Sequence, residues 1–112
     1  MKEAVDILRR QGMVFKSLHP LRADVLGTRK RATFYIGVDL KGYYVFVIHM
    51  RKKSRMLRKE VQELEVLHAK AEKAVDSTIK YKILVLDAPL CSKAKADLEE
   101  KGWRVFLVKN EE

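Results

Sequence analysis

The most informative part of the chain is residues 32–50, which read ATFYIGVDLKGYYVFVIHM. Two runs rich in aromatic and β-branched residues, 32–38 and 43–50, are typical of β-strands. Residues 39–42, Asp-Leu-Lys-Gly, separate them, and Gly42 can adopt the left-handed conformation that a tight turn requires. The stretch therefore predicts an antiparallel hairpin.

The second strand of this hairpin is apolar on both faces. One face carries Tyr44, Phe46, Ile48 and Met50, and the other carries Tyr43, Val45 and Val47 before His49 and Arg51. A strand with two apolar faces belongs in the interior of a sheet that is covered on both sides. We therefore expect helices above and below this strand.

The flanking segments alternate between helical and strand patterns. Upstream, the sequence predicts a short helix over 2–11 that Gly12 ends, a short strand over 13–15 that His19-Pro20 breaks, and an irregular basic stretch over 20–31. Downstream, it predicts a helix over 54–76, a strand over 79–86, a helix over 93–101 that Ser92 caps, and a last strand over 103–108. A strand, a helix and a strand in succession favour a parallel pair. We expect a single three-layer α/β domain over residues 1–112, with a mixed central sheet and helices on both faces.

Composition restricts the class of protein. The chain has 112 residues, of which 47% are apolar and 35% are charged, as in a globular domain. Its single Cys excludes an internal disulfide framework and an all-Cys metal site. No run approaches the roughly 18 apolar residues of a membrane-spanning helix, and the opening residues lack the apolar run of a secretory signal. We therefore expect a cytoplasmic protein.

Positive charge is concentrated in the first half of the chain. The net charge is +9, and residues 1–59 hold 15 Lys and Arg against 4 Asp and Glu. The excess comes mainly from two clusters, residues 29–31 and 51–59. Such a field attracts polyanions, which favours a nucleic-acid surface. A solvated basic face, or a face that docks an acidic protein partner, explains the same pattern.

The order of helix, strand, hairpin, basic stretch, helix and strand resembles the restriction-endonuclease-like, or PD-(D/E)XK, nucleases. The small archaeal Holliday junction resolvases are similar in layout. In that family the second hairpin strand ends in an acid-x-Lys motif and an Asp lies on the neighbouring strand. The acids hold Mg²⁺, and the Lys helps to position the attacking water. The resemblance implies a nucleic-acid substrate and, because the resolvases are dimers, a homodimer.

The corresponding motif in this chain is His49-Met50-Arg51, which has no acid at its first position. If Asp39 pairs with Tyr43 across the turn, His49 faces Thr33 and Arg51 faces Arg31, so neither partner supplies the missing Asp. Asp24, which precedes the hairpin, is the remaining candidate. One carboxylate and one His among cations make a poor Mg²⁺ site. The weak catalytic candidates are thus Asp24, His49 and Arg51, with no metal site and no cofactor unless a nuclease activity remains.

The sequence therefore predicts a nuclease-like domain that binds the nucleic-acid backbone without cutting it. The residues expected to contact phosphates are Arg29, Lys30, Arg31, Arg51, Lys52, Lys53, Arg55, Arg58 and Lys59. Two alternatives stay open at this point. One is an active or residual nuclease on DNA or structured RNA that uses Asp24 and His49, and the other is an interaction module that docks an acidic protein.

Overall fold

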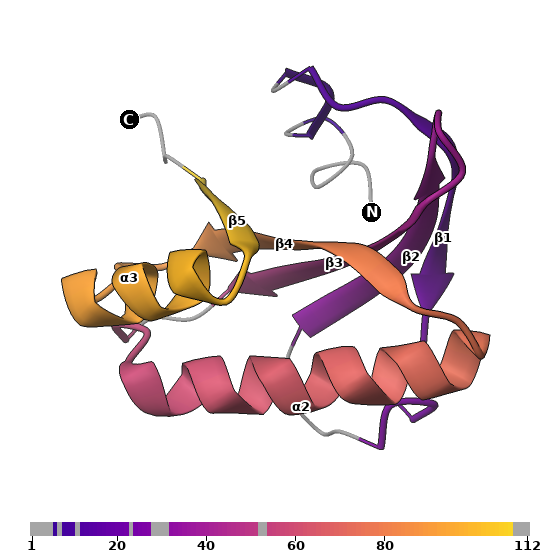
Figure 1. Ribbon diagram of the computed structural model, residues 1–112. Coiled ribbons are helices and arrows are strands. Elements are labelled where there is room, and N and C mark those ends of the chain that lie inside the picture. The colour runs from indigo at the N-terminus through magenta and orange to yellow at the C-terminus, as the bar shows by residue number, and fades with distance from the viewer. Residues whose placement is uncertain are drawn as a thin grey trace.

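The computed structural model describes residues 6, 8–10, 12–22, 24–27, 32–51 and 54–108. Its centre is a five-stranded sheet in the order β1-β2-β3-β4-β5. The first three strands are antiparallel to one another, and β3, β4 and β5 are parallel (Figure 1). The elements are β1 (Phe15–Leu21), β2 (Ala32–Asp39), β3 (Tyr44–Arg51), α2 (Arg58–Val75), β4 (Ile79–Asp87), α3 (Ser92–Glu100) and β5 (Trp103–Leu107).

The hairpin forms with the predicted register. Thr33 pairs with His49, and Val38 pairs with Tyr44. The turn is fixed by the carboxylate of Asp39, whose Oδ1 accepts the backbone N–H groups of Lys41 and Tyr43, each at 2.9 Å. These bonds hold the two strands in a single alignment.

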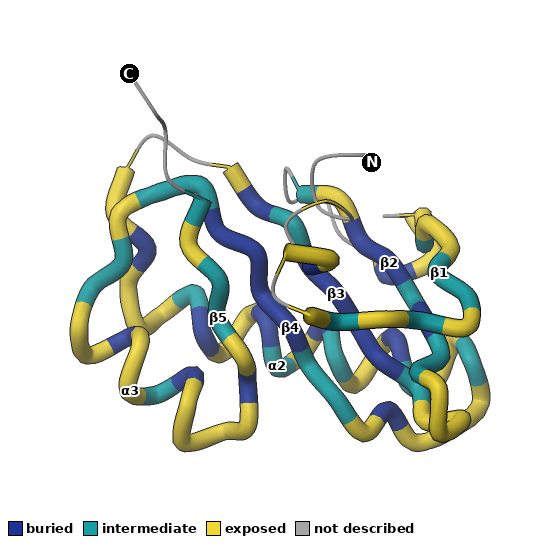
Figure 2. The backbone as a smooth tube through the Cα atoms, turned by 90° about the horizontal axis from the view of Figure 1, so that it is seen from above, coloured by how far each residue is buried: buried dark blue, intermediate teal, exposed yellow. Residues whose placement is uncertain are grey.

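The sheet is covered on both faces, as the two apolar faces of β3 predicted. Helices α2 and α3 lie on one face, where Phe46 and Ile48 pack with Leu64 and Leu98. On the other face Leu8, from the helical residues 8–10, packs with five buried residues of the sheet, Tyr35, Val45, Val47, Ile83 and Val85. Figure 2 shows the buried positions gathered along the central strands.

The first strand runs from Phe15 to Leu21 and shares only Phe15 with the strand predicted over 13–15. β1 continues through His19 and Pro20 to Leu21, whereas we expected Pro20 to end it. Because β1 is the outer strand of the sheet and pairs only with β2, it tolerates a residue that has no backbone N–H. The break predicted at His19-Pro20 is therefore wrong.

Both helix starts differ from the predicted ones. α2 begins at Arg58 rather than at 54, because Met56 forms an isolated parallel bridge with Leu90 and the N-cap residue Leu57 has an extended backbone. Ser92 is the first residue of α3, and Cys91 takes the N-cap position that we assigned to Ser92. In the part of the chain that the structure describes, no helix is long and apolar enough to cross a membrane.

Candidate nucleic-acid interface

The carboxyl ends of β3 and β4 and the first turns of α2 and α3 meet at one edge of the sheet. β3 and β4 are parallel and finish side by side, with Arg51 paired to Asp87. The segments that follow them are joined by backbone hydrogen bonds, from the N–H of Met56 to the carbonyl of Pro89 at 2.9 Å and from the N–H of Cys91 to the carbonyl of Met56 at 3.1 Å. In Figure 1 the arrowheads of β3 and β4 and the first turns of α2 and α3 lie together on the left.

Four described cations of the predicted set lie at this edge, which we call the basic edge: Arg51, Arg55, Arg58 and Lys59. Lys93, in the first turn of α3, lies beside them. All four are exposed to solvent. The N-termini of α2 and α3 add partial positive charge, because their first backbone N–H groups point out of the helix. The edge therefore combines exposed cationic side chains with helix dipoles that present the same sign of charge.

Two of these cations already have acidic partners. The Nε of Arg58 donates to Oδ2 of Asp97 at 2.7 Å, and the hydrogen bond and charge of that carboxylate raise the pKa of Arg58. Arg51 Nε lies 3.5 Å from Oδ2 of Asp87. Arg55 and Lys59 form no ion pair with any residue that the structure describes. Of the four, these two are the cations most available to an incoming phosphate.

The Cys91 thiol is sensitive to the positive potential of this edge. Backbone N–H groups of Ala94 and Lys93 at the start of α3, and then the charge of Arg55, lower the pKa of the Cys91 thiol. Each of these causes stabilises a negative group. The same environment favours a phosphate oxygen placed there.

The three catalytic candidates are divided between the two faces of the sheet. His49 and Arg51 share a face because they are two residues apart on β3, and Ile48 and Met50 point to the α2 side. Asp24 belongs to a turn that packs on the α2 side through Leu26, and its carboxylate pairs with Arg22 at 2.8 Å. The structure thus brings His49 and Arg51 together but does not bring Asp24 to them.

The side chain whose place beside Arg51 the sequence did not predict is Asp87. It lies beside Arg51 at the end of β4, on the face that carries His49. The hairpin pattern could not reveal it, because the register of a parallel pair depends on the crossover and not on a turn. The parallel pairing expected for the last two strands concerns β4 and β5, and it does not give the alignment of β4 with β3.

The donor set at this edge does not fit the Mg²⁺ of the nuclease family. His49 stands where the resemblance implies an acid, and the neighbouring carboxylate, Asp87, lies beside the guanidinium of Arg51. Among the described residues no three His, Cys, Asp or Glu side chains gather closely enough to hold a metal ion. Mg²⁺ prefers oxygen ligands, of which this set supplies one carboxylate.

Five of the predicted phosphate contacts, Arg29, Lys30, Arg31, Lys52 and Lys53, lie outside the described residues. The other four form the basic edge. The structure therefore gathers every described member of the predicted set on one side of the molecule.

Comparison with known proteins gives a likeness of fold. No protein-family model matches the chain, and no curated protein matches it. Among solved structures, it is similar to a repair endonuclease from Pyrococcus abyssi, with a TM-score of 0.58 and 18% identity over 97% of this chain. It is also similar to EndoMS in its apo form, with a TM-score of 0.52 and 20% identity, and in the EndoMS-dsDNA2 complex, with a TM-score of 0.53 and 19% identity, each over 99% of this chain.

The chain spans about half the length of these neighbours, covering 46% of the Pyrococcus enzyme and of apo EndoMS and 45% of EndoMS in the complex. At this level of identity the likeness establishes the architecture. The mixed five-stranded sheet of this protein has the restriction-endonuclease-like fold of these repair endonucleases.

Proposed function

We propose that this protein binds the phosphate backbone of nucleic acids through the basic edge and does not cut it. One observation carries the proposal. Arg55 and Lys59, which have no ion pair among the described residues, lie beside the N-termini of α2 and α3. Cations and helix N-termini are the two features that most often contact phosphate in proteins.

The fold supports the choice of ligand. One of the similar solved structures is the EndoMS-dsDNA2 complex, in which a protein of this architecture is bound to DNA. In the present chain the position of the family's acid is His49, so the site favours contact with phosphate over metal-assisted hydrolysis of it. Phosphate contacts of this kind position a protein on nucleic acid without reading its sequence.

The test is fluorescence anisotropy with labelled duplex DNA, four-way-junction DNA and structured RNA. We expect the double variant Arg55→Glu/Lys59→Glu to bind at least tenfold more weakly than the wild type, because two attractive contacts become repulsive. A matched control, Lys73→Glu/Lys101→Glu, makes the same change of net charge at exposed positions at the C-terminal ends of α2 and α3, away from the edge. Equal losses in the two double variants would show that only the overall charge matters, and would contradict the proposal.

A residual nuclease is the second candidate, and one observation favours it. His49, Arg51 and Asp87 share a face at the end of the sheet, where a base, a cation and a carboxylate could act on a phosphodiester. Gels of the same samples with Mg²⁺ or Mn²⁺ separate the two candidates. Intact nucleic acid supports the binding function, whereas cleavage that His49→Ala abolishes would establish the nuclease.

A further inference from the structure

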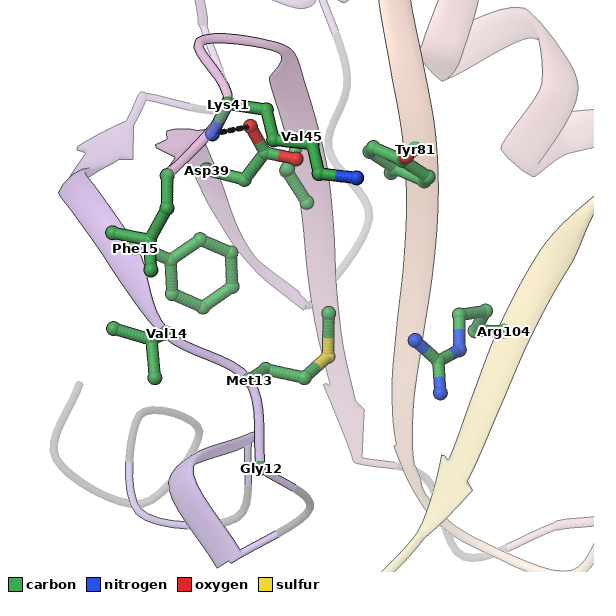
Figure 3. Close-up of a pocket in the computed structure, with 10 residues that line it drawn as sticks. Gly12, Met13, Val14, Phe15, Asp39, Lys41, Val45, Tyr81 and Arg104 are labelled. Atoms are coloured by element: carbon green, nitrogen blue, oxygen red, sulfur yellow. Dashed lines mark hydrogen bonds between the residues drawn. The ribbon is translucent and has the colours of Figure 1, made fainter.

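A second site lies at the other end of the sheet. A cavity of about 370 Å³ opens between the segment before β1 and the strands β3, β4 and β5. Its walls include Met13, Val14, Phe15, Leu40, Tyr81 and Arg104 (Figure 3). This volume is in the range of pockets that hold ligands or side chains of a partner. It is six residues along β3 from Arg51, or about 20 Å, so it is separate from the basic edge.

The cavity is surrounded by exposed apolar side chains. Val14 and Leu40, which line it, are 60% and 61% exposed. Tyr43 is also exposed, and its ring meets the edge of Tyr81 with the centroids 6.3 Å apart. Large apolar side chains that gather around a cavity at the surface are typical of protein-interaction sites. Val14 and Leu40 offer a nucleobase or a phosphate no specific contact.

The charge around the cavity is positive. Figure 3 shows the ammonium group of Lys41 and the guanidinium of Arg104 turned toward the space beside Tyr81. Lys80 adds a third cation, with its Nζ 3.8 Å from the centre of the Tyr43 ring. None of the three forms an ion pair with a described carboxylate. Asp39, the one acid among the described lining residues, is already hydrogen-bonded to the backbone of its own turn.

We propose that this cavity docks a short acidic peptide segment of a partner protein, with one aromatic or aliphatic side chain inserted between Met13 and Tyr81. The flanking carboxylates of the peptide pair with Lys41, Lys80 and Arg104. A second copy of this chain is a poor occupant, because two identical patches would bring like charges together. The inference is independent of nucleic-acid binding, since it uses different residues.

The experiment is an NMR titration of the full chain with a seven-residue probe peptide, Glu-Asp-Glu-Phe-Glu-Asp-Glu. We expect binding in the micromolar range and the largest shifts at Val14, Leu40 and Tyr81. Replacing the central Phe of the peptide by Ala should weaken binding at least fivefold, because the apolar anchor is lost. On the protein, Arg104→Glu should weaken it at least tenfold, and Leu40→Ser should do so without any change of charge. Lys95→Glu, an exposed control on α3, should leave it unchanged.

Several outcomes would overturn the inference. They are the absence of binding at millimolar peptide, equal binding of the Phe and Ala peptides, shifts confined to the basic edge, and tighter binding of a nucleoside monophosphate at the same residues. Nucleic-acid binding provides the cross-check. The Arg104→Glu variant should bind nucleic acid as the wild type does, and the Arg55→Glu/Lys59→Glu variant should bind the peptide as the wild type does.

Discussion

Among single residues, Glu65 makes the most consequential polar contacts. Its Oε2 accepts the indole N–H of Trp103 at 2.6 Å and the ammonium of Lys82 at 3.0 Å. Burial alone would raise the pKa of Glu65, but the hydrogen bonds from Trp103 and Lys82 outweigh it and hold the pKa below the ordinary value of 4.5. One carboxylate thus fastens α2 to β4 and β5.

We expect Glu65→Ala to lower the free energy of unfolding by about 1–3 kcal/mol, because the buried indole N–H of Trp103 loses its acceptor. A pH series distinguishes the charge from the hydrogen bond. Since the folded-state pKa of Glu65 is depressed, its contribution is present above the unfolded value near 4.5 and is lost as the pH falls through the folded value. Urea unfolding should show that the free energy of unfolding of the wild type falls at acid pH, and that it falls less in Glu65→Gln. Equal acid sensitivity of the two proteins would contradict this assignment.

Gly37 shows how a single position fixes the contact between two strands. A Cβ at Gly37 would lie 2.9 Å from the backbone oxygen of Ser17 and 2.9 Å from Leu18 Cδ1. The backbone oxygen cannot move aside as a flexible side chain would. β1 therefore lies as close to β2 as it does because residue 37 has no side chain.

We expect Gly37→Ala to destabilise the protein by about 1–3 kcal/mol, the usual cost of overpacking. Gly42→Ala is the matched control. It meets no atom within 4 Å, but Gly42 has a φ of +92°, so strain in the turn should cost about 1 kcal/mol. The urea midpoint should fall for both variants, and the amide signals of β1 should shift only in Gly37→Ala. Unchanged β1 signals there would mean that the strand does not depend on this close approach.

At the scale of elements, α2 and α3 are joined by an ion pair between Arg58, the first residue of α2, and Asp97 in the second half of α3. Exposed pairs of this kind contribute little to stability. The pair does withhold one cation of the basic edge from an external phosphate. We therefore expect Asp97→Asn to leave the urea midpoint nearly unchanged and to tighten nucleic-acid binding by roughly twofold to fivefold, the scale of one exposed charge contact. Weaker binding in Asp97→Asn would show that the pair positions Arg58 for the ligand.

The elements also show which parts of the fold a sequence can predict. The register of the hairpin, with Thr33 opposite His49, followed from turn chemistry and two-residue alternation, both of which are local. The full length of β1 did not follow, because Pro20 is tolerated only where one side of a strand is unpaired, and that depends on the whole sheet. Asp87 beside Arg51 was missed for the same reason, since the register between parallel strands is set by a distant crossover.

On the scale of the whole molecule, the charge is distributed between two separate surfaces. The basic edge gathers Arg51, Arg55, Arg58 and Lys59, and the cavity at the opposite end of β3 is flanked by Lys41, Lys80 and Arg104. The sequence predicted the first surface from its local density of cations. It could not predict the second, because residues 41, 80 and 104 come together only when β3, β4 and β5 align.

The salt dependence of nucleic-acid binding tests the central claim most directly. Each neutralised phosphate contributes about −0.9 to the slope of log affinity against log salt, so four to nine contacts give a slope between about −4 and −8. We expect a slope in this range for the wild type and a shallower one for Arg55→Glu/Lys59→Glu, with the nucleic acid intact. Affinity that does not change with salt, or no binding at low salt, would contradict the account.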